Sequence, residues 1–234
     1  MIRIFGSQGA LTTKGGRTLP AFEIRSAPRA FAVLALIVFD LAIGAPGATA
    51  QVPIPTIPPP VPVVVDGKTT AYVVLDLTSV ICAPQPACQA TLPAAAALLT
   101  KARNATVPVI YSETPTPGST ILAEVAPRPT EPKVTGRADK FYGTALDDIL
   151  KSKGIKTLII AGTAANGAVL YTAFGANVRG YTVVVATDGI SAAPFPMLLT
   201  QYQLLNQPGF ANPENTPLAE NKVTLSRSDL ITFR

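Results

Sequence analysis

Asp76 is the strongest candidate for a catalytic residue in this chain, because it has a carboxylate at the end of a predicted strand. It stands near the end of an apolar run, in Val-Val-Leu-Asp-Leu-Thr-Ser. A carboxylate with apolar neighbours loses hydration, so its pKa rises and it becomes suited to general acid or base catalysis. A capping or salt-bridged aspartate is the structural alternative. The apolar surroundings favour the catalytic interpretation.

Two other acidic residues follow predicted strands. Asp188 precedes Gly189 in Thr-Asp-Gly-Ile, which is typical of a turn, so we assign it a structural role. Glu113 opens a loop of turn-forming residues that leads into an irregular segment up to about Asp139. Such a loop is a candidate lid or substrate wall, and we expect its residues 112–137 to set specificity. Glu113 itself either lines the site or is merely solvated.

Several mechanisms are excluded by the residues that the chain lacks. It contains no histidine, which rules out Ser-His-Asp and Cys-His catalysis and zinc sites built on imidazole. No phosphate-binding Gly-x-x-x-x-Gly-Lys and no Gly-x-Gly-x-x-Gly follows a predicted strand. We therefore predict neither a cofactor nor a metal.

The only two cysteines, Cys82 and Cys88, flank two prolines in Cys-Ala-Pro-Gln-Pro-Ala-Cys. In an exported chain, such an isolated pair most simply forms a disulfide that holds the loop after the first strand. A nucleophilic or metal-binding role is the alternative, but no base or further ligand stands nearby in the sequence.

The element best placed to form a site is the stretch from Thr157 to Ala173. An unbroken apolar run, Leu158 to Ala161, predicts a strand buried on both faces, and Gly162 follows it directly. Small residues then recur at helical spacing, which predicts a helix packed closely on a sheet. Ligands bind at such strand-to-helix turns in open α/β sheets, although the stretch could also be one ordinary βα unit.

The remaining pattern alternates strand and helix. This order predicts an α/β fold with a mainly parallel, Rossmann-like sheet and helices on both faces. The predicted strands are 71–77, 107–111, 158–161, 181–186 and 223–225, and the predicted helices are 91–104, 145–153, 168–176 and 197–205.

The first 62 residues differ from this domain. Two arginines, an apolar stretch and Ala48-Thr49-Ala50 predict a signal peptide over residues 1–50, with cleavage after Ala50 and a periplasmic or secreted product. An uncleaved membrane anchor is the alternative, but the apolar run before Asp40 is shorter than the roughly 20 residues that a spanning helix needs. Residues 51–62 contain six prolines and predict an extended linker, with a single domain over 63–234.

Charge gives little support to nucleic-acid binding. The chain carries a net charge of +5, and residues 1–50 contribute five basic and two acidic residues, or +3, which leaves +2 for residues 51–234. That remainder has no basic cluster and no interleaved aromatic pairs. We therefore expect no nucleic-acid partner and, after cleavage, no stable membrane insertion.

From about Ala71 to Thr232 the chain resembles the isochorismatase-like hydrolases, also called the cysteine hydrolase family. The similarity is carried by the order and spacing of several segments, and the family's Rossmann-like fold agrees with the pattern above. These segments are the strand ending in Asp76, Lys101-Ala102-Arg103 before Val107–Tyr111, Phe141–Leu146, Gly162–Val169, and Gly180-Tyr181 leading to Asp188.

Active members of that family combine an Asp after the first strand, a Lys before a Phe-x-Gly-Thr segment, and a Cys at a helix start. The resemblance therefore implies Asp76 as a catalytic residue. The usual lysine position falls on Thr135, so we assign the catalytic lysine to Lys140, with Lys133 as the alternative. The cysteine position falls on Ala168, which excludes attack by a thiolate.

Family members similar to true isochorismatases also have a small residue at that position, and they protonate a vinyl ether with the Asp. The resemblance thus implies a hydrolase that acts on a small molecule by Asp general acid/base catalysis, and the predicted signal peptide makes it an exported one. Backbone N–H groups of the helix start would hold a substrate oxygen, and a non-proline cis peptide is implied near Ala164-Ala165. The expected substrate-binding residues are Arg137, Ala164, Ala165, Asn166, Gly167 and Ala168.

Two other functions stay open. The missing cysteine and the displaced lysine also fit a catalytically inactive protein that binds a small molecule with the same fold. An oligomeric scaffold with an incidental crevice is the third interpretation. Because the family commonly forms oligomers, the resemblance implies a homo-oligomer in each case.

Overall fold

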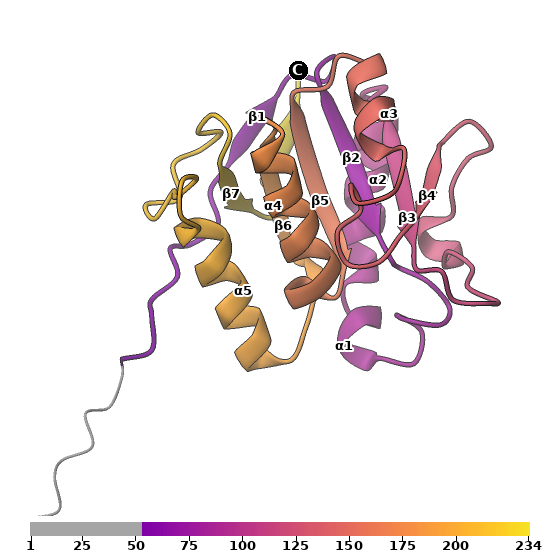
Figure 1. Cartoon of the computed structure of the whole chain (residues 1–234), viewed down its shortest axis with the longest axis horizontal. Helices are drawn as coiled ribbons and strands as arrows, with labels where there is room; N and C mark the ends of the chain where they lie inside the picture. The colour runs from indigo at the N-terminus through magenta and orange to yellow at the C-terminus, as the bar shows by residue number, and fades with distance from the viewer. Residues whose placement is uncertain (1–52) are drawn as a thin grey trace, which may run out of the picture. The chain divides into compact units, whose positions relative to one another are not determined.

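A six-stranded, fully parallel sheet forms the centre of the computed structural model, which describes residues 53–234. The strand order is β4-β3-β2-β5-β6-β7, which confirms the predicted α/β fold (Figure 1). The predicted signal peptide and its cleavage site lie outside the described residues. The strands are β2 (Thr70–Leu75), β3 (Val109–Glu113), β4 (Lys133–Thr135), β5 (Thr157–Thr163), β6 (Thr182–Ser191) and β7 (Val223–Ser226).

Helices cover both faces of this sheet, as predicted. Helices α3, α4 and α5 pack on one face, whereas α2 packs on the other together with a small parallel sheet of β1 and β8 (Figure 1). None of the helices in the described part of the chain is long and apolar enough to cross a membrane. The bounds are α1 (Pro86–Gln89), α2 (Leu92–Asn104), α3 (Leu146–Ser152), α4 (Leu170–Val178), α5 (Pro194–Asn206), β1 (Val63–Val65) and β8 (Ile231–Phe233), with a 3₁₀ turn at Ala123–Val125 and a π-helical turn at Ala165–Val169.

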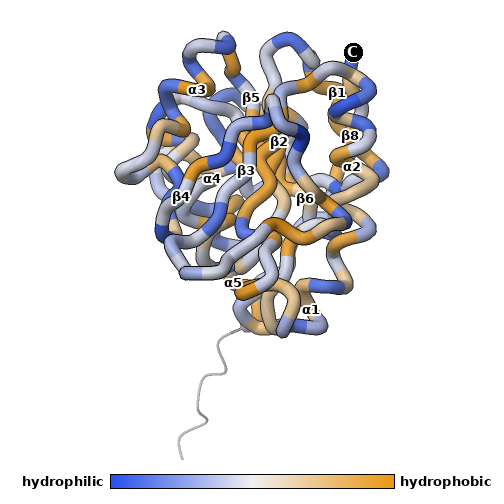
Figure 2. The backbone as a smooth tube through the Cα atoms, turned by 90° about the vertical axis from the view of Figure 1, so that its right-hand side faces the viewer, coloured by the Kyte–Doolittle hydropathy of each residue, from blue (hydrophilic) through white to orange (hydrophobic). Residues whose placement is uncertain are grey.

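The two faces of the sheet are separated by the period-2 alternation of its strands. One row of residues, aligned across five strands, packs in the core beneath α3, α4 and α5. The residues next to them along each strand face α2. The central strands are accordingly the most hydrophobic part of the backbone (Figure 2). The row is Ile110, Val73, Ile160, Val185 and Leu225.

Strand β6 is longer than predicted, and the prediction of a turn at Asp188-Gly189 is wrong. The strand continues to Ser191, and its last residues pair with Gly162 and Thr163 at the end of β5. The intervening residues are accommodated by a register shift between the two strands. A bulge can hold turn-forming residues without ending the strand, because its extra residues leave the ladder unpaired locally.

The last residues of the proline-rich segment are hydrogen-bonded to the domain. The Asn215 side chain donates a 3.0 Å hydrogen bond to the Pro59 carbonyl. The Val61 N–H donates to the Leu225 carbonyl on β7 at 3.0 Å. The segment therefore covers the open edge of the sheet, where unpaired backbone groups would otherwise face solvent.

The strand order places a crevice at the centre of the sheet. From β2 the chain moves outward to β3 and β4, and it then returns to β5 on the other side of β2. At such a reversal, the connections leave the strands' carboxyl ends in opposite directions and open a crevice for ligands. The residues just after β2 and β5 are Asp76 and Ala164.

Candidate active site

Asp76 is fixed at the carboxyl end of β2 by its backbone. Its φ of 52° lies in the left-handed region, which aspartate tolerates better than most residues. Its N–H continues the sheet ladder by donating to the Ser112 carbonyl at 3.2 Å, and its carbonyl accepts from the Thr78 N–H at 2.8 Å. The side chain leaves the strand at this turn with only 3% of the residue exposed.

Two side chains bind the Asp76 carboxylate, one on each oxygen. The Ser112 hydroxyl, in the strand register opposite Leu75, donates to Oδ1 at 2.8 Å. The Lys140 ammonium lies 2.8 Å from Oδ2 and is completely buried. Lys140 Nζ also donates to the Gly136 carbonyl at 2.8 Å, so a second oxygen partly satisfies the buried cation.

Lys140 reaches Asp76 from the loop between β4 and α3. Its backbone N–H donates to Thr172 Oγ1 on α4 at 3.2 Å, and its carbonyl accepts a hydrogen bond from the Thr144 hydroxyl. Next to it, the Phe141 ring packs into the core. These contacts anchor both sides of the lysine, so its ammonium has a defined position.

Burial is the dominant influence on the Asp76 carboxyl. It raises the pKa above the ordinary value of 3.8, and the ion pair with Lys140 and the hydrogen bond from Ser112 offset only part of that rise. The carboxylate is therefore more basic than a solvated aspartate, while the adjacent ammonium favours its ionised form. Such a group can accept a proton and hold it long enough to pass it on.

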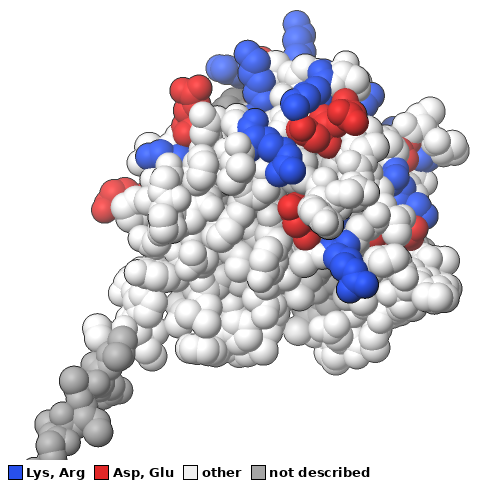
Figure 3. All heavy atoms as spheres, in the orientation of Figure 1, with Lys and Arg blue, Asp and Glu red and all other residues white. Residues whose placement is uncertain are grey.

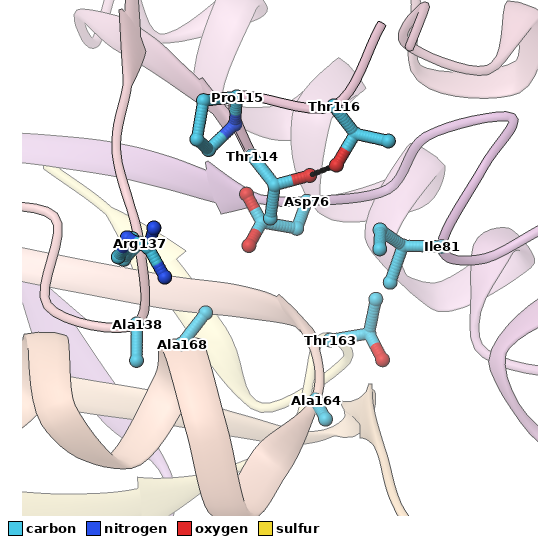
Figure 4. Close-up of a pocket in the computed structure, with 10 residues that line it drawn as sticks. All are labelled: Asp76, Ile81, Thr114, Pro115, Thr116, Arg137, Ala138, Thr163, Ala164 and Ala168. Carbon is cyan, nitrogen blue, oxygen red and sulfur yellow. Dashed lines mark hydrogen bonds between the residues drawn. The ribbon is translucent and has the colours of Figure 1, made fainter.

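Asp76 borders a cleft of about 670 Å³, a volume suited to a small molecule. Figure 4 shows Arg137 at one end of this cleft and Ile81 at the other, with the Asp76 carboxylate between them. Thr114 and Thr116 form one wall and share a hydrogen bond of 2.9 Å. The remaining lining residues are Pro115, Ala138, Thr163, Ala164 and Ala168.

The strand-to-helix turn after β5 closes the opposite side of the cleft. Gly162 has a φ of 136°, and a Cβ built on it would lie 2.0 Å from the Leu75 carbonyl oxygen. Only glycine therefore allows β5 to approach β2 so closely at this point. The Thr163-Ala164 peptide is cis, one bond before the position that the resemblance implied.

The structure brings only some of the predicted binding residues to the cleft. Arg137, Ala164 and Ala168 line it, together with Asp76. Ala165 is buried in the core beneath the turn, and Asn166 faces a groove beside Phe195 on α5. Gly167 is not among the residues lining the cleft.

The two candidate lysines have separate partners. Lys133 lies 2.8 Å from Glu113 Oε1, in an ion pair outside the cleft lining, whereas Lys140 holds Asp76. Asp188 accepts hydrogen bonds from the Ser228 N–H at 2.8 Å and from its hydroxyl at 2.6 Å. Its carboxylate thus joins β6 to the chain after β7, in keeping with a structural assignment.

Cys82 and Cys88 are joined by a disulfide, as predicted. Both are fully buried, and they fix the segment that carries Ile81 to the edge of the cleft. Within residues 53–234, no three acidic or cysteine side chains gather into a group that could hold a metal ion.

Sequence reasoning missed the residues that complete the surroundings of Asp76. Ser112 was assigned only to a specificity loop, although it ends an otherwise apolar strand next to β2. The signal in the sequence is a polar residue at the end of an apolar strand, which suggests that its side chain has a polar partner on the neighbouring strand. The loop that the sequence marked as a candidate substrate wall does supply Thr114, Pro115 and Thr116 to the cleft, whereas the sequence did not single out Ile81.

Comparisons with known proteins agree with this architecture. Residues 70–206 match the family model of the isochorismatase domain, whereas no curated protein matches the chain. Among similar solved structures is an N-carbamoylsarcosine amidase from Thermoplasma acidophilum, with 22% identity, a TM-score of 0.56, and 69% of this chain and 97% of that one covered.

Two further solved structures share the fold. A nicotinamidase from Staphylococcus aureus has 17% identity and a TM-score of 0.59, with 68% of this chain and 99% of that one covered. An isochorismatase family protein from Burkholderia thailandensis has 23% identity and a TM-score of 0.57, with 73% and 96% covered. At these identities the likeness concerns the fold alone.

Proposed function

The chain belongs to the isochorismatase family, and we propose that it is an exported hydrolase of a small molecule with Asp76 as its general base and acid. The observation that carries this proposal is the position of the Asp76 carboxylate. It borders the cleft, its pKa is raised by burial, and each oxygen accepts one hydrogen bond or ion pair from the protein. A carboxylate oxygen can accept more than one such bond, so the side chain keeps capacity for a water or substrate.

The proposed reaction needs no nucleophilic side chain. A water beside Ala168 gives a proton to Asp76 while its oxygen forms a bond to the substrate's carbonyl carbon. Asp76 then returns that proton to the leaving nitrogen or oxygen as the scissile bond breaks. The small Ala168 side chain leaves room for this water, in a place where a larger residue would fill the cleft.

Lys140 and Ser112 would support both stages. Both contacts favour the ionised form of the carboxylate, and they hold it in one orientation toward the cleft. We assign the developing oxyanion to the backbone N–H of Ala168, because Ala168 is the residue of the Ala165–Val169 turn that lines the cleft.

Hydrolysis by the purified protein should be measured on a panel of small amides, esters and enol ethers. Asp76→Asn is the test variant, and Asp148→Asn, an exposed aspartate on α3, is the matched control. We expect turnover by the wild type and the control, with a loss of about 100-fold or more in Asp76→Asn. Circular dichroism of each variant verifies folding. Equal turnover by Asp76→Asn would refute the assignment.

A catalytically inactive binding protein is the second candidate, and Ala168 is the observation that favours it. The residue lies on the cleft where the family resemblance places a nucleophile. In that case, no member of the panel is hydrolysed by any variant. Ligands would instead raise the melting temperature of the wild type by mass action.

Export and self-association are further parts of the proposal. The Cys82–Cys88 disulfide supports an oxidising compartment, as the predicted signal peptide does. Exposed apolar side chains on α4 and α5, including Tyr171, Phe195 and Leu199, support an interface between copies. In Figure 3 the surface over α5 carries few charged side chains, whereas charges gather at the opposite end. Light scattering of the purified protein would measure its mass.

A further inference from the structure

Within residues 53–234, Arg137 is the only cationic residue that lines the cleft. Among residues 53–234 its guanidinium takes part in no ion pair, and the residue is exposed at the cleft. The other nearby cations are already paired. Lys140 is buried against Asp76, and Lys133 is bound to Glu113.

The acidic residues around the cleft do not balance Arg137. Asp76 and Lys140 form a neutral pair, and so do Glu113 and Lys133. Asp139, two residues from Arg137, accepts a hydrogen bond from the Phe141 N–H at 2.9 Å and does not line the cleft. In the part of the chain that the structure describes, the cleft therefore presents one positive charge without a protein partner.

The arrangement of the lining residues gives this charge a defined place. Arg137 lies at one end of the cleft, to one side of the Asp76 carboxylate, and Ala138 and Ala168 line the cleft next to it, on the side of Thr163 and Ala164 (Figure 4). These small apolar side chains would contact the body of a ligand but could not compete for its charge. A ligand lying against these alanines could place one group at Arg137 and another at Asp76, since all four residues line the same cleft.

We propose that Arg137 binds a carboxylate of the substrate, so that the substrate is a small monocarboxylic acid whose scissile bond lies at Asp76. This inference rests on the proposed function for the position of the scissile bond. A guanidinium matches a carboxylate with two parallel hydrogen bonds. One unbalanced positive charge suits a monoanion, whereas a phosphate dianion would leave a negative charge in the cleft.

The test compares matched ligands that differ only in charge. Succinamate and hippurate are measured beside their uncharged amides, succinamide and hippuramide, by calorimetric titration of the purified protein. The variants are Arg137→Gln and Arg137→Lys. Arg128→Gln is the control, because Arg128 is an exposed arginine that does not line the cleft.

We expect the wild type and Arg128→Gln to bind at least one of the acids about tenfold more tightly than its amide. Arg137→Gln should remove that preference, and Arg137→Lys should keep part of it, because an ammonium supplies charge without the planar fork. Affinities within twofold for acid and amide, or no binding of either acid, would overturn the inference.

Binding also separates this inference from the proposed function. A carboxylate preference that depends on Arg137 would support the inference even if no bond were hydrolysed. Hydrolysis that depends on Asp76 but favours the uncharged amides would overturn the inference and leave the hydrolase proposal intact.

Discussion

Lys140 Nζ lies 2.8 Å from Asp76 Oδ2, although neither residue is open to solvent. Removing two charges from water costs more free energy than an ion pair commonly restores, so such a pair is weak evidence for stability. The pair does fix a charged carboxylate at the border of a cleft. Such a position is what the proposed role of Asp76 in catalysis requires.

Removing the lysine alone should destabilise the protein strongly. In Lys140→Met the Asp76 carboxylate stays buried without a cation, and we expect a loss of about 3–5 kcal/mol in the free energy of unfolding. The double variant Asp76→Leu/Lys140→Met should recover most of that loss. Lys133→Met is the control, because this partly exposed lysine should contribute about 1 kcal/mol or less. Urea denaturation measures the free energy of unfolding of all four proteins. A Lys140→Met variant as stable as the wild type would contradict the argument.

The sequence was sufficient to predict the parallel sheet and the position of Asp76 at the carboxyl end of its first central strand. Apolar runs of strand length, alternating with helical periodicity, define a parallel sheet, and an aspartate at the end of such a run must face the crevice. The partner of Asp76 was harder to identify. Lys133 and Lys140 are both near the expected position in the chain, and only the path of the loop decides which ammonium reaches the carboxylate.

Other features depended on long-range contacts that leave no local pattern. Strands β1 and β8 each have three residues, and they exist because the two ends of the domain pair with each other. The last part of β6 was predicted as a turn, because Asp188-Gly189 has turn chemistry and its pairing with β5 cannot be seen in sequence. The loops that supply Thr114, Thr116 and Ile81 to the cleft have no periodicity at all.

The raised pKa of Asp76 should appear in the pH dependence of activity. If the ionised carboxylate is the base, kcat/KM rises with pH through a pKa above the ordinary 3.8. Ser112→Ala removes a hydrogen bond that favours the ionised form, so its acidic limb should move to still higher pH. Activity that falls with rising pH through this range would instead assign Asp76 as the initial acid.

Stability should depend on Asp76 with a sign opposite to that of a salt-bridged surface aspartate. Because the folded state raises this pKa, it binds the proton more tightly than the unfolded chain does. The contribution of Asp76 to the free energy of unfolding is therefore full below about 3.8 and is lost as pH rises through the folded-state pKa. Urea denaturation of the wild type and of Asp76→Asn should be measured across this pH range. As pH rises, the free energy of unfolding of the wild type should fall relative to that of Asp76→Asn. A constant difference would disprove the coupling.

Gly162 should be irreplaceable even by alanine. A Cβ at this position would meet the Leu75 carbonyl oxygen at 2.0 Å, in addition to the unfavourable φ of 136°. We expect Gly162→Ala to lower the free energy of unfolding by about 3 kcal/mol or more. Gly118→Ala separates the two causes, because Gly118 has a φ of 76° but no atom within 4 Å of the added Cβ, and it should cost only about 1 kcal/mol. Equal losses in the two variants would show that backbone conformation alone, and not the approach of β5 to β2, requires glycine.

The Cys82–Cys88 disulfide should support the cleft as well as the fold. It closes a short loop, so the double variant Cys82→Ser/Cys88→Ser should lose about 2 kcal/mol in the free energy of unfolding. Ile81 lines the cleft next to Cys82. Loss of the disulfide should free the segment that carries Ile81, so the double variant should also bind ligands more weakly. Intact mass spectrometry of native protein should show a mass lower than that of the reduced sample by two hydrogen atoms. Native protein with two free thiols would contradict the disulfide, and unchanged affinity in the double variant would confine its role to stability.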